Sequence, residues 1–146
     1  MDSRTNAPTP KAVWAGRFLS GLIASLLLLD AYGKLAGIPP VIEGTARMGY
    51  PVDLVFAIGV IELVCVTVYL VPRTAVVGAV LLTGYFGGAV ASHVRIEDPL
   101  WTHVLSGVYA ASLVWGGLVL RDRRLLGFLA FGGRRAEPSP PATVAA

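Results

Sequence analysis

The sequence predicts an all-α protein: a bundle of four transmembrane helices, with a short interfacial segment between helices 1 and 2 and a disordered C-terminal tail. Three observations predict this fold. Of the 146 residues, 55% are hydrophobic and 14% are charged, whereas soluble domains average about 25% charged residues. The apolar residues fall in long, nearly uncharged blocks, which are typical of membrane spans. The basic residues flank these blocks instead of lining one face, a placement that indicates membrane topology and argues against nucleic-acid binding.

Four apolar blocks predict the four spans, each close to the length of about 20 residues that crosses a hydrocarbon core. They cover residues 13–36, 52–71, 75–93 and 102–120, which together form a membrane domain over residues 13–120. The first block exceeds the usual length of a signal-peptide core, carries Asp30 and Lys34, and lacks an A-x-A site before the next block. We therefore expect it to be retained as a helix.

The connections between the spans are short and differ in character. Residues 38–51 open with two prolines after Ile38 and close with Gly-Tyr-Pro, and a short interfacial helix fits between them around Val41–Met48. The turn over residues 72–74 is so short that the second and third spans must be antiparallel neighbours. The loop over residues 94–101 is polar and returns to the membrane at a tryptophan.

The distribution of basic residues predicts that both termini are cytoplasmic, because cytoplasmic loops carry the excess of Lys and Arg. Residues 1–12 then form a cytoplasmic N-terminal segment. Residues 121–131 form either a basic amphipathic segment at the inner leaflet or a stop-transfer charge cluster, and residues 132–146 a disordered tail. Arg17, inside the first span, is expected to anchor the helix by reaching the headgroups. The basic residues on the cytoplasmic side are Arg4, Lys11, Arg73, Arg121, Arg123, Arg124, Arg134 and Arg135, and those on the outer side are Arg47 and Arg95.

Small residues recur every four positions on two of the spans. They are Gly16, Ser20 and Ala24 on the first span and Gly84, Gly88 and Ser92 on the third. Such spacing lets helix backbones approach closely, which predicts a compact bundle. The same faces are equally consistent with a homo-oligomer.

Ionisable side chains inside the spans are the strongest candidates for function. Glu62 lies about halfway along the second span, where a carboxylate must be neutral, paired or exposed to a wet cavity. Asp30 and Lys34 are four residues apart and share one face of the first span. Two arrangements stay open: Lys34 pairs with Asp30 only, or Lys34 reaches Glu62 while Asp30 meets another donor. Cys65 is the single cysteine, so the chain alone cannot form a disulfide or a thiolate metal cluster.

Two histidines flank the loop over residues 94–101. The ten-residue separation of His93 and His103 matches no specific metal motif, so no metal site is predicted. His93 is the better functional candidate, because it ends the third span, rich in small residues, and can point inward. Tyr85 and Tyr109 lie at mid to outer depth and are further candidates for contact with a ligand.

The polar candidates come from three of the spans and lie at or above the midplane. They are Asp30, Lys34, Glu62 and His93. A polar pocket that opens to the outer side is the simplest common explanation.

Five short segments follow one another in a distinctive order along the spans. They are Gly33-Lys34-Leu35, Gly49-Tyr50-Pro51, Gly59-Val60-Ile61-Glu62-Leu63, Pro72-Arg73, and Ser92-His93 followed by Asp98-Pro99. In order, spacing and placement these segments resemble the DoxX-like family over about residues 19–115. The resemblance implies a small four-helix integral membrane protein in which Lys34, Glu62 and His93 match the polar residues of the family, whereas Asp30 is less typical. It implies no single reaction, since the family includes a subunit of a membrane thiosulfate:quinone oxidoreductase, proteins associated with redox systems, and membrane accessory or cargo-handling proteins.

Three functions are open at this point. The first is a binding or accessory protein that holds a lipophilic molecule such as a quinone, or a membrane-protein partner, against Lys34, Glu62 and His93. No resident cofactor is predicted, because the chain lacks a heme-type histidine pair within the spans, a flavin loop and a nicotinamide motif. The second is an enzyme for isomerisation, epoxide opening or cyclisation of a lipophilic substrate, with Glu62 as acid and His93 or Asp30 as base. The third is a transport or proton-pathway component, since intramembrane acids often mark such pathways.

Overall fold

The protein is helical throughout the part of the chain that the structure, a computed structural model, describes: residues 10–121 and Leu125. The elements in chain order are α1 (Pro10–Leu35), α2 (Pro39–Arg47), α3 (Val52–Leu70), α4 (Ala75–Arg95), the π-helical turn η1 (Leu100–Val104) and α5 (Ser106–Arg121). Helices α1, α3 and α4, and η1 together with α5, are each long and apolar enough to cross a membrane. The predicted all-α bundle of four membrane-spanning helices is confirmed.

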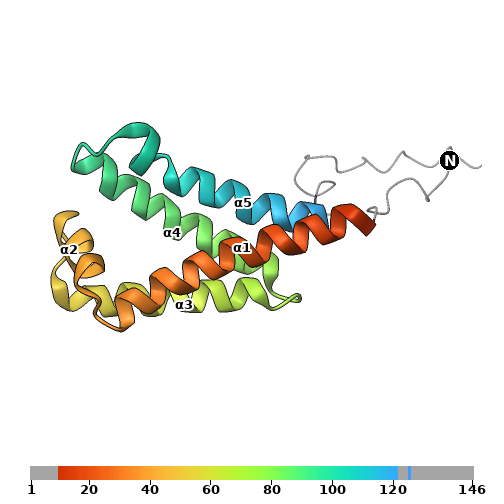
Figure 1. Ribbon diagram of the computed structural model, residues 1–146, viewed down its shortest axis with the longest axis horizontal. Helices are drawn as coiled ribbons and strands as arrows, with labels where there is room; N and C mark the ends of the chain where they lie inside the picture. Colours follow the sequence, from red (N-terminus) through yellow and green to blue (C-terminus); the bar gives the residue numbers. More distant parts are fainter. Residues whose placement is uncertain (1–9, 122–124, 126–146) are drawn as a thin grey trace, which may run out of the picture.

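The four long helices form a ring in which each helix packs against two others (Figure 1). Helix α1 packs against α3 and α5, and α4 packs against the same two helices. The diagonal pairs, α1 with α4 and α3 with α5, lie farther apart, and within the described residues no Cα atoms of these pairs approach within 8 Å. Helix α2 lies on α1 and α3 at one end of the bundle, the end at which η1 joins α4 to α5. We call this the α2 end, and the opposite end, which holds the connection from α3 to α4, the turn end.

The helix bounds differ from the predicted spans by a few residues. The described part of α1 starts at Pro10, three residues before the predicted span. Helix α4 continues to Arg95, and η1 adds a π-helical turn before α5. The short helix expected between the first two spans is present as α2, which starts with the two prolines after Ile38.

The predicted terminal segments fall mostly outside the described residues. Of the segment 1–12, the structure describes residues 10–12, which belong to α1. Of the predicted segment 121–131 it describes Arg121 and Leu125, both helical, and the predicted tail 132–146 lies wholly outside.

The apolar core fills the bundle from the turn end to about its middle. Its fully buried side chains include Tyr69 and Val66 of α3, Leu82 of α4 and Val114 of α5. The hydroxyl of Tyr69 lies 2.8 Å from Ser20 Oγ and 3.1 Å from the carbonyl oxygen of Val114, so it joins α3 to both α1 and α5. A hydrogen-bonded tyrosine buries a large ring without leaving its hydroxyl unpaired. The α2 end has a different interior, which is polar and partly hollow.

The small residues of the first span pack as predicted. Gly16, Ser20 and Ala24 are all buried. A Cβ atom at Gly16 would lie 2.8 Å from the carbonyl oxygen of Gly117, so α1 and α5 approach too closely here for a side chain. This stripe therefore forms the contact between α1 and α5.

The corresponding prediction for the third span is wrong for its two glycines. A Cβ atom at Gly84 or Gly88 would meet no atom within 4 Å, and both residues line a cavity. The close approach of α4 occurs instead at Gly78, where a Cβ atom would lie 2.3 Å from the backbone nitrogen of Tyr69. A four-residue spacing identifies a smooth helix face, but it does not say whether a helix or a cavity lies opposite.

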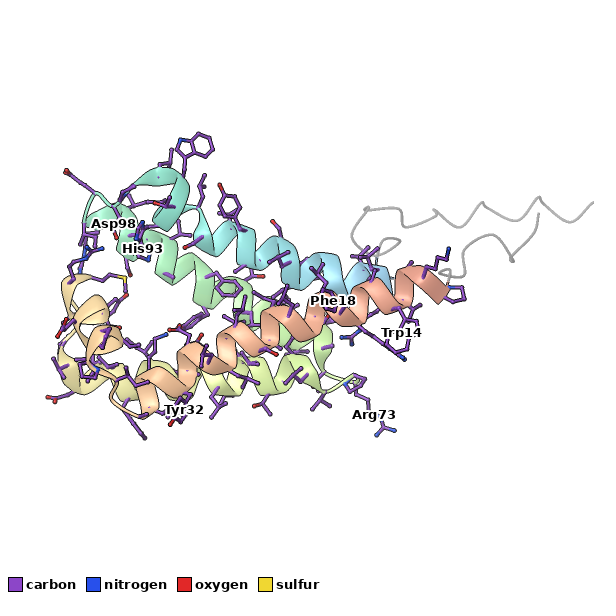
Figure 2. The ribbon with its side chains drawn as sticks, in the orientation of Figure 1. Trp14, Phe18, Tyr32, Arg73, His93 and Asp98 are labelled. Atoms are coloured by element: carbon purple, nitrogen blue, oxygen red, sulfur yellow. The ribbon has the colours of Figure 1, made fainter. Side chains whose placement is uncertain are left out.

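Large apolar side chains cover the outside of the bundle. Trp14, Phe18 and Tyr32 of α1 are all mostly exposed (Figure 2). An exposed apolar surface on every long helix is what a lipid environment requires, because lipid tails solvate such side chains at no cost.

Candidate functional site

The centre of the site is an ammonium group between two carboxylates. The Lys34 ammonium donates a hydrogen bond to Glu62 Oε2 at 2.9 Å and another to the carboxylate of Asp30. The Lys34 side chain is 9% exposed, that of Glu62 is fully buried, and that of Asp30 is 49% exposed. Both pairings that the sequence left open therefore exist at once, and Asp30 meets Lys34 rather than a further donor.

A glycine brings the two helices of this ion cluster together. A Cβ atom at Gly59 would lie 2.8 Å from Lys34 Cβ, so α1 crosses α3 with no room for a side chain. Gly59 precedes Glu62 by three residues, and residues at this spacing share one helix face. The close crossing at Gly59 therefore places Glu62 within reach of the Lys34 ammonium.

Helix α4 completes the arrangement around Glu62. The Tyr85 hydroxyl donates a hydrogen bond to Glu62 Oε2 at 2.9 Å, so this oxygen accepts from both Tyr85 and Lys34. Glu62 Oε1 accepts from neither, and it is the one buried side-chain nitrogen or oxygen of the described residues that has no hydrogen-bond partner. A buried polar atom without a partner is costly and rare in native proteins, so it calls for a physical explanation.

The ion cluster forms one wall of a cavity of about 610 Å³ at the α2 end. All five helices contribute to its lining, and the volume lies within the range of about 300–1,000 Å³ that is usual for small-molecule sites. Apolar side chains such as Leu27, Ile58, Ile61 and Phe86 line other parts of the wall. The space exists because Gly84 and Gly88 carry no side chains on the face that α4 turns toward the cavity.

Hydrogen bonds connect α2, α4 and the loops at the α2 end of the bundle. Asp98 accepts from Arg47 of α2 at 3.0 Å and pairs with His93 Nδ1 of α4 at 2.6 Å. His93 and Asp98 lie together at the α2 end (Figure 2). The His93 ring, and to a smaller extent the charge of Arg47, hold the pKa of Asp98 below its ordinary value. Nearby, the Tyr50 hydroxyl forms a hydrogen bond with Ser92 Oγ at 2.7 Å. Arg95 donates a hydrogen bond to the backbone carbonyl of Met48.

The structure brings most of the predicted site residues together. Asp30, Lys34, Glu62, Tyr85 and His93 all line the cavity. The Nδ1 atom of His93, however, bonds to Asp98 rather than to the Lys34–Glu62 pair.

Tyr109 and His103 do not line the cavity, and Tyr109 is about half exposed. The rings of His93 and His103 are 5.7 Å apart. The described residues contain no group of three or more potential metal ligands.

Sequence reasoning missed the contribution of α2 and of the loop between α2 and α3. Thr45 and Tyr50 both line the cavity, and Tyr50 is bonded to Ser92, which had been assigned only to helix packing. Tyr50 and Ser92 are 42 residues apart in the chain, so no local sequence pattern indicates their contact. The only available hint is that a tyrosine stands between the two turn-forming residues Gly49 and Pro51.

Comparison with known proteins gives one match. The model of the DoxX-like family matches residues 18–117, a range that includes every residue lining the cavity. The chain matches none of the curated proteins and none of the solved structures with which it was compared.

Proposed function

The chain belongs to the DoxX-like family and is a multi-pass membrane protein, and from this premise we propose that it binds a lipophilic small molecule. The apolar part of the ligand occupies the cavity, and its polar end faces the Lys34–Glu62 pair. A quinone-like molecule has this combination of an apolar body and a polar end. Lys11, Arg17, Arg73 and Arg121 lie toward the turn end, and Arg47 and Arg95 lie toward the α2 end. This difference favours an orientation in which the turn end is cytoplasmic and the α2 end, with the cavity, lies on the outer side.

The observation that carries the proposal is the buried Glu62 Oε1, which has no hydrogen-bond partner among the described residues and belongs to a side chain that lines the cavity. Removing a hydrogen-bonding atom from water without a partner costs about 1–3 kcal/mol, and more for a charged group. A head group that draws the Glu62 carboxylate toward the cavity and exchanges a hydrogen bond with this oxygen would remove that cost. The Lys34 ammonium offers a second contact, because it has three N–H donors and uses two of them within the described part of the chain.

The mixed character of the lining supports the same class of ligand. Charged groups lie on one wall, while Leu27 and Phe86 are among the apolar residues elsewhere in the lining. A strongly polar solute would make no favourable contact with those apolar side chains. An alkane would form no hydrogen bond with the ion cluster. An amphipathic molecule matches both parts.

Filling the cavity tests the proposal. Gly88→Leu places a side chain into the cavity, and its Cβ meets no atom within 4 Å, so the fold is expected to survive. Gly87→Leu is the matched control, because Gly87 also has open space but does not line the cavity. Native mass spectrometry and lipid extraction of the purified proteins are expected to find the same lipophile in wild type and Gly87→Leu, and little or none in Gly88→Leu.

Two outcomes would overturn the proposal. One is equal retention of the lipophile by Gly88→Leu and Gly87→Leu, with both variants folded by circular dichroism. The other is a wild-type protein that carries no lipophile and takes up none from a panel of quinones and isoprenoid alcohols.

A further inference from the structure

We propose that the turn end of the bundle carries a second binding site, which holds the phosphate of an anionic phospholipid between Arg17 and Arg121. These two side chains line a separate hollow of about 480 Å³. The hollow lies at the opposite end of the bundle from the ligand cavity, so this site is independent of the function proposed above.

The hollow lies near the membrane surface, because helix ends contribute to its lining. Its lining includes Leu70, the last residue of α3, and Ala75, the first residue of α4. The hollow therefore lies where α3 ends and α4 begins, at the level of the lipid headgroups. Arg17 reaches this level although it is inside α1, because α1 starts two helical turns earlier, about 10 Å along its axis.

The charged side chains that line the hollow in the described part of the chain are both positive. Among the described residues, Arg17 and Arg121 are the two charged ones that line it, and no carboxylate does. Neither arginine forms an ion pair with any other described residue. Arg17 lies 6.0 Å from the centre of the Trp14 ring, a contact that leaves the guanidinium N–H donors available. Two neighbouring guanidinium groups without a carboxylate beside them in the described part of the chain form a site for an anion, and their planar donor geometry suits phosphate in particular.

The close packing of α1 against α5 explains why the two arginines share the hollow. A Cβ atom at Gly16 would lie 3.0 Å from Cγ of Arg121, so the Arg121 side chain runs across the backbone of α1. Arg17 is the next residue of α1. The same stripe of small residues that packs the two helices thus brings the second guanidinium beside the first.

The apolar part of the lining favours a lipid over a free anion. The other described residues of the lining are all apolar: Val13, Leu70, Pro72, Ala75, Val76, Leu118 and Leu125. Free phosphate would gain nothing from these walls, whereas the acyl chains of a phospholipid would cover them. Basic pockets between transmembrane helices at the cytoplasmic side are suited to anionic headgroups in this way.

The test uses the full chain in nanodiscs of phosphatidylcholine that contain increasing fractions of phosphatidylglycerol. Native mass spectrometry then counts the phosphatidylglycerol molecules that stay bound. Arg17→Gln/Arg121→Gln removes both charges of the hollow. Lys11→Gln/Arg73→Gln is the matched control, because it removes the same charge near the same end from residues that do not line the hollow.

Wild type and the control are expected to retain one phosphatidylglycerol with similar affinity. The hollow variant is expected to bind it about 30-fold more weakly, at about fivefold for each arginine near the membrane surface. Val76→Trp narrows the hollow without changing any charge, and it is expected to lose the lipid as well. Millimolar inorganic phosphate is expected not to displace the lipid.

Three results would overturn the inference. Equal losses in the hollow variant and the control would show general attraction to an anionic bilayer instead of a site. Unchanged retention in the hollow variant would show that the arginines do not hold the lipid. Displacement by inorganic phosphate would show a site for the free anion.

Discussion

Replacing Lys34 with methionine tests whether the buried carboxylate of Glu62 depends on its cation. Methionine keeps most of the length of the lysine stem and removes the charge. Glu62 is fully buried, and Lys34 is 9% exposed. Removing one partner of a buried ion pair costs about 3–5 kcal/mol, because the other charge is left uncompensated. The loss should arise mainly from Glu62, since Asp30 is half exposed and can be solvated.

The double variant Lys34→Met/Glu62→Leu separates the loss of the ion pair from the loss of packing. With both charges removed, no buried carboxylate is left without a cation, and such replacements are often neutral or stabilising. Tyr85 loses its acceptor, at about 1 kcal/mol. We therefore expect the free energy of unfolding of the double variant to return to within about 2 kcal/mol of the wild-type value.

Titration with sodium dodecyl sulfate in mixed micelles, followed by circular dichroism and tryptophan fluorescence, measures these differences. Arg47→Met is the control, because it breaks an ion pair whose arginine is 63% exposed, and its loss should be much smaller. Equal losses for Lys34→Met and Arg47→Met would refute the dependence of Glu62 on its cation. A double variant no more stable than Lys34→Met would attribute the loss to packing of the lysine stem.

Two further predictions concern helix packing and the α2 end. Gly78→Ala places a Cβ 2.3 Å from the backbone nitrogen of Tyr69, so we expect a loss of about 1–3 kcal/mol in the same titration. Gly21→Ala, which meets no atom within 4 Å, should show no loss, and equal stabilities of the two variants would contradict this account. Because the His93 ring lowers the pKa of Asp98 below 3.8, the contact stabilises the fold above that pH and ceases to do so as the pH falls through the lowered pKa. The stability advantage of wild type over Asp98→Asn should therefore shrink as the pH falls below 3.8, and an advantage that does not shrink on acidification would contradict it.

The interior of the bundle differs between its two ends, and this difference has a physical basis in the sequence of α4. Toward the turn end, Ala79 and Leu82 are fully buried against the other helices. Toward the α2 end, Gly84 and Gly88 leave space that no neighbouring side chain fills. The apolar core thus lies mainly in one half of the bundle, and the other half contains a polar cluster and a cavity.

The sequence by itself determined the features that depend on local composition. The four spans could be predicted because the hydropathy of about 20 consecutive residues decides whether a segment crosses a bilayer. Asp30, Lys34 and Glu62 could be identified as site residues because a charge inside a span is costly and needs a partner. The antiparallel pairing of α3 and α4 followed from the shortness of their turn.

Only the tertiary structure decided which partners these residues meet. The rotation of each helix about its axis is set by contacts with its neighbours, and these contacts join residues far apart in the chain. That rotation brings Tyr85 to Glu62 and leaves Tyr109 outside the cavity, although both tyrosines lie in spans. It also turns His93 toward Asp98, and it opens the glycine face of α4 onto a cavity instead of a helix. Periodicity shows which residues share a helix face, but the object opposite that face depends on the packing of the whole bundle.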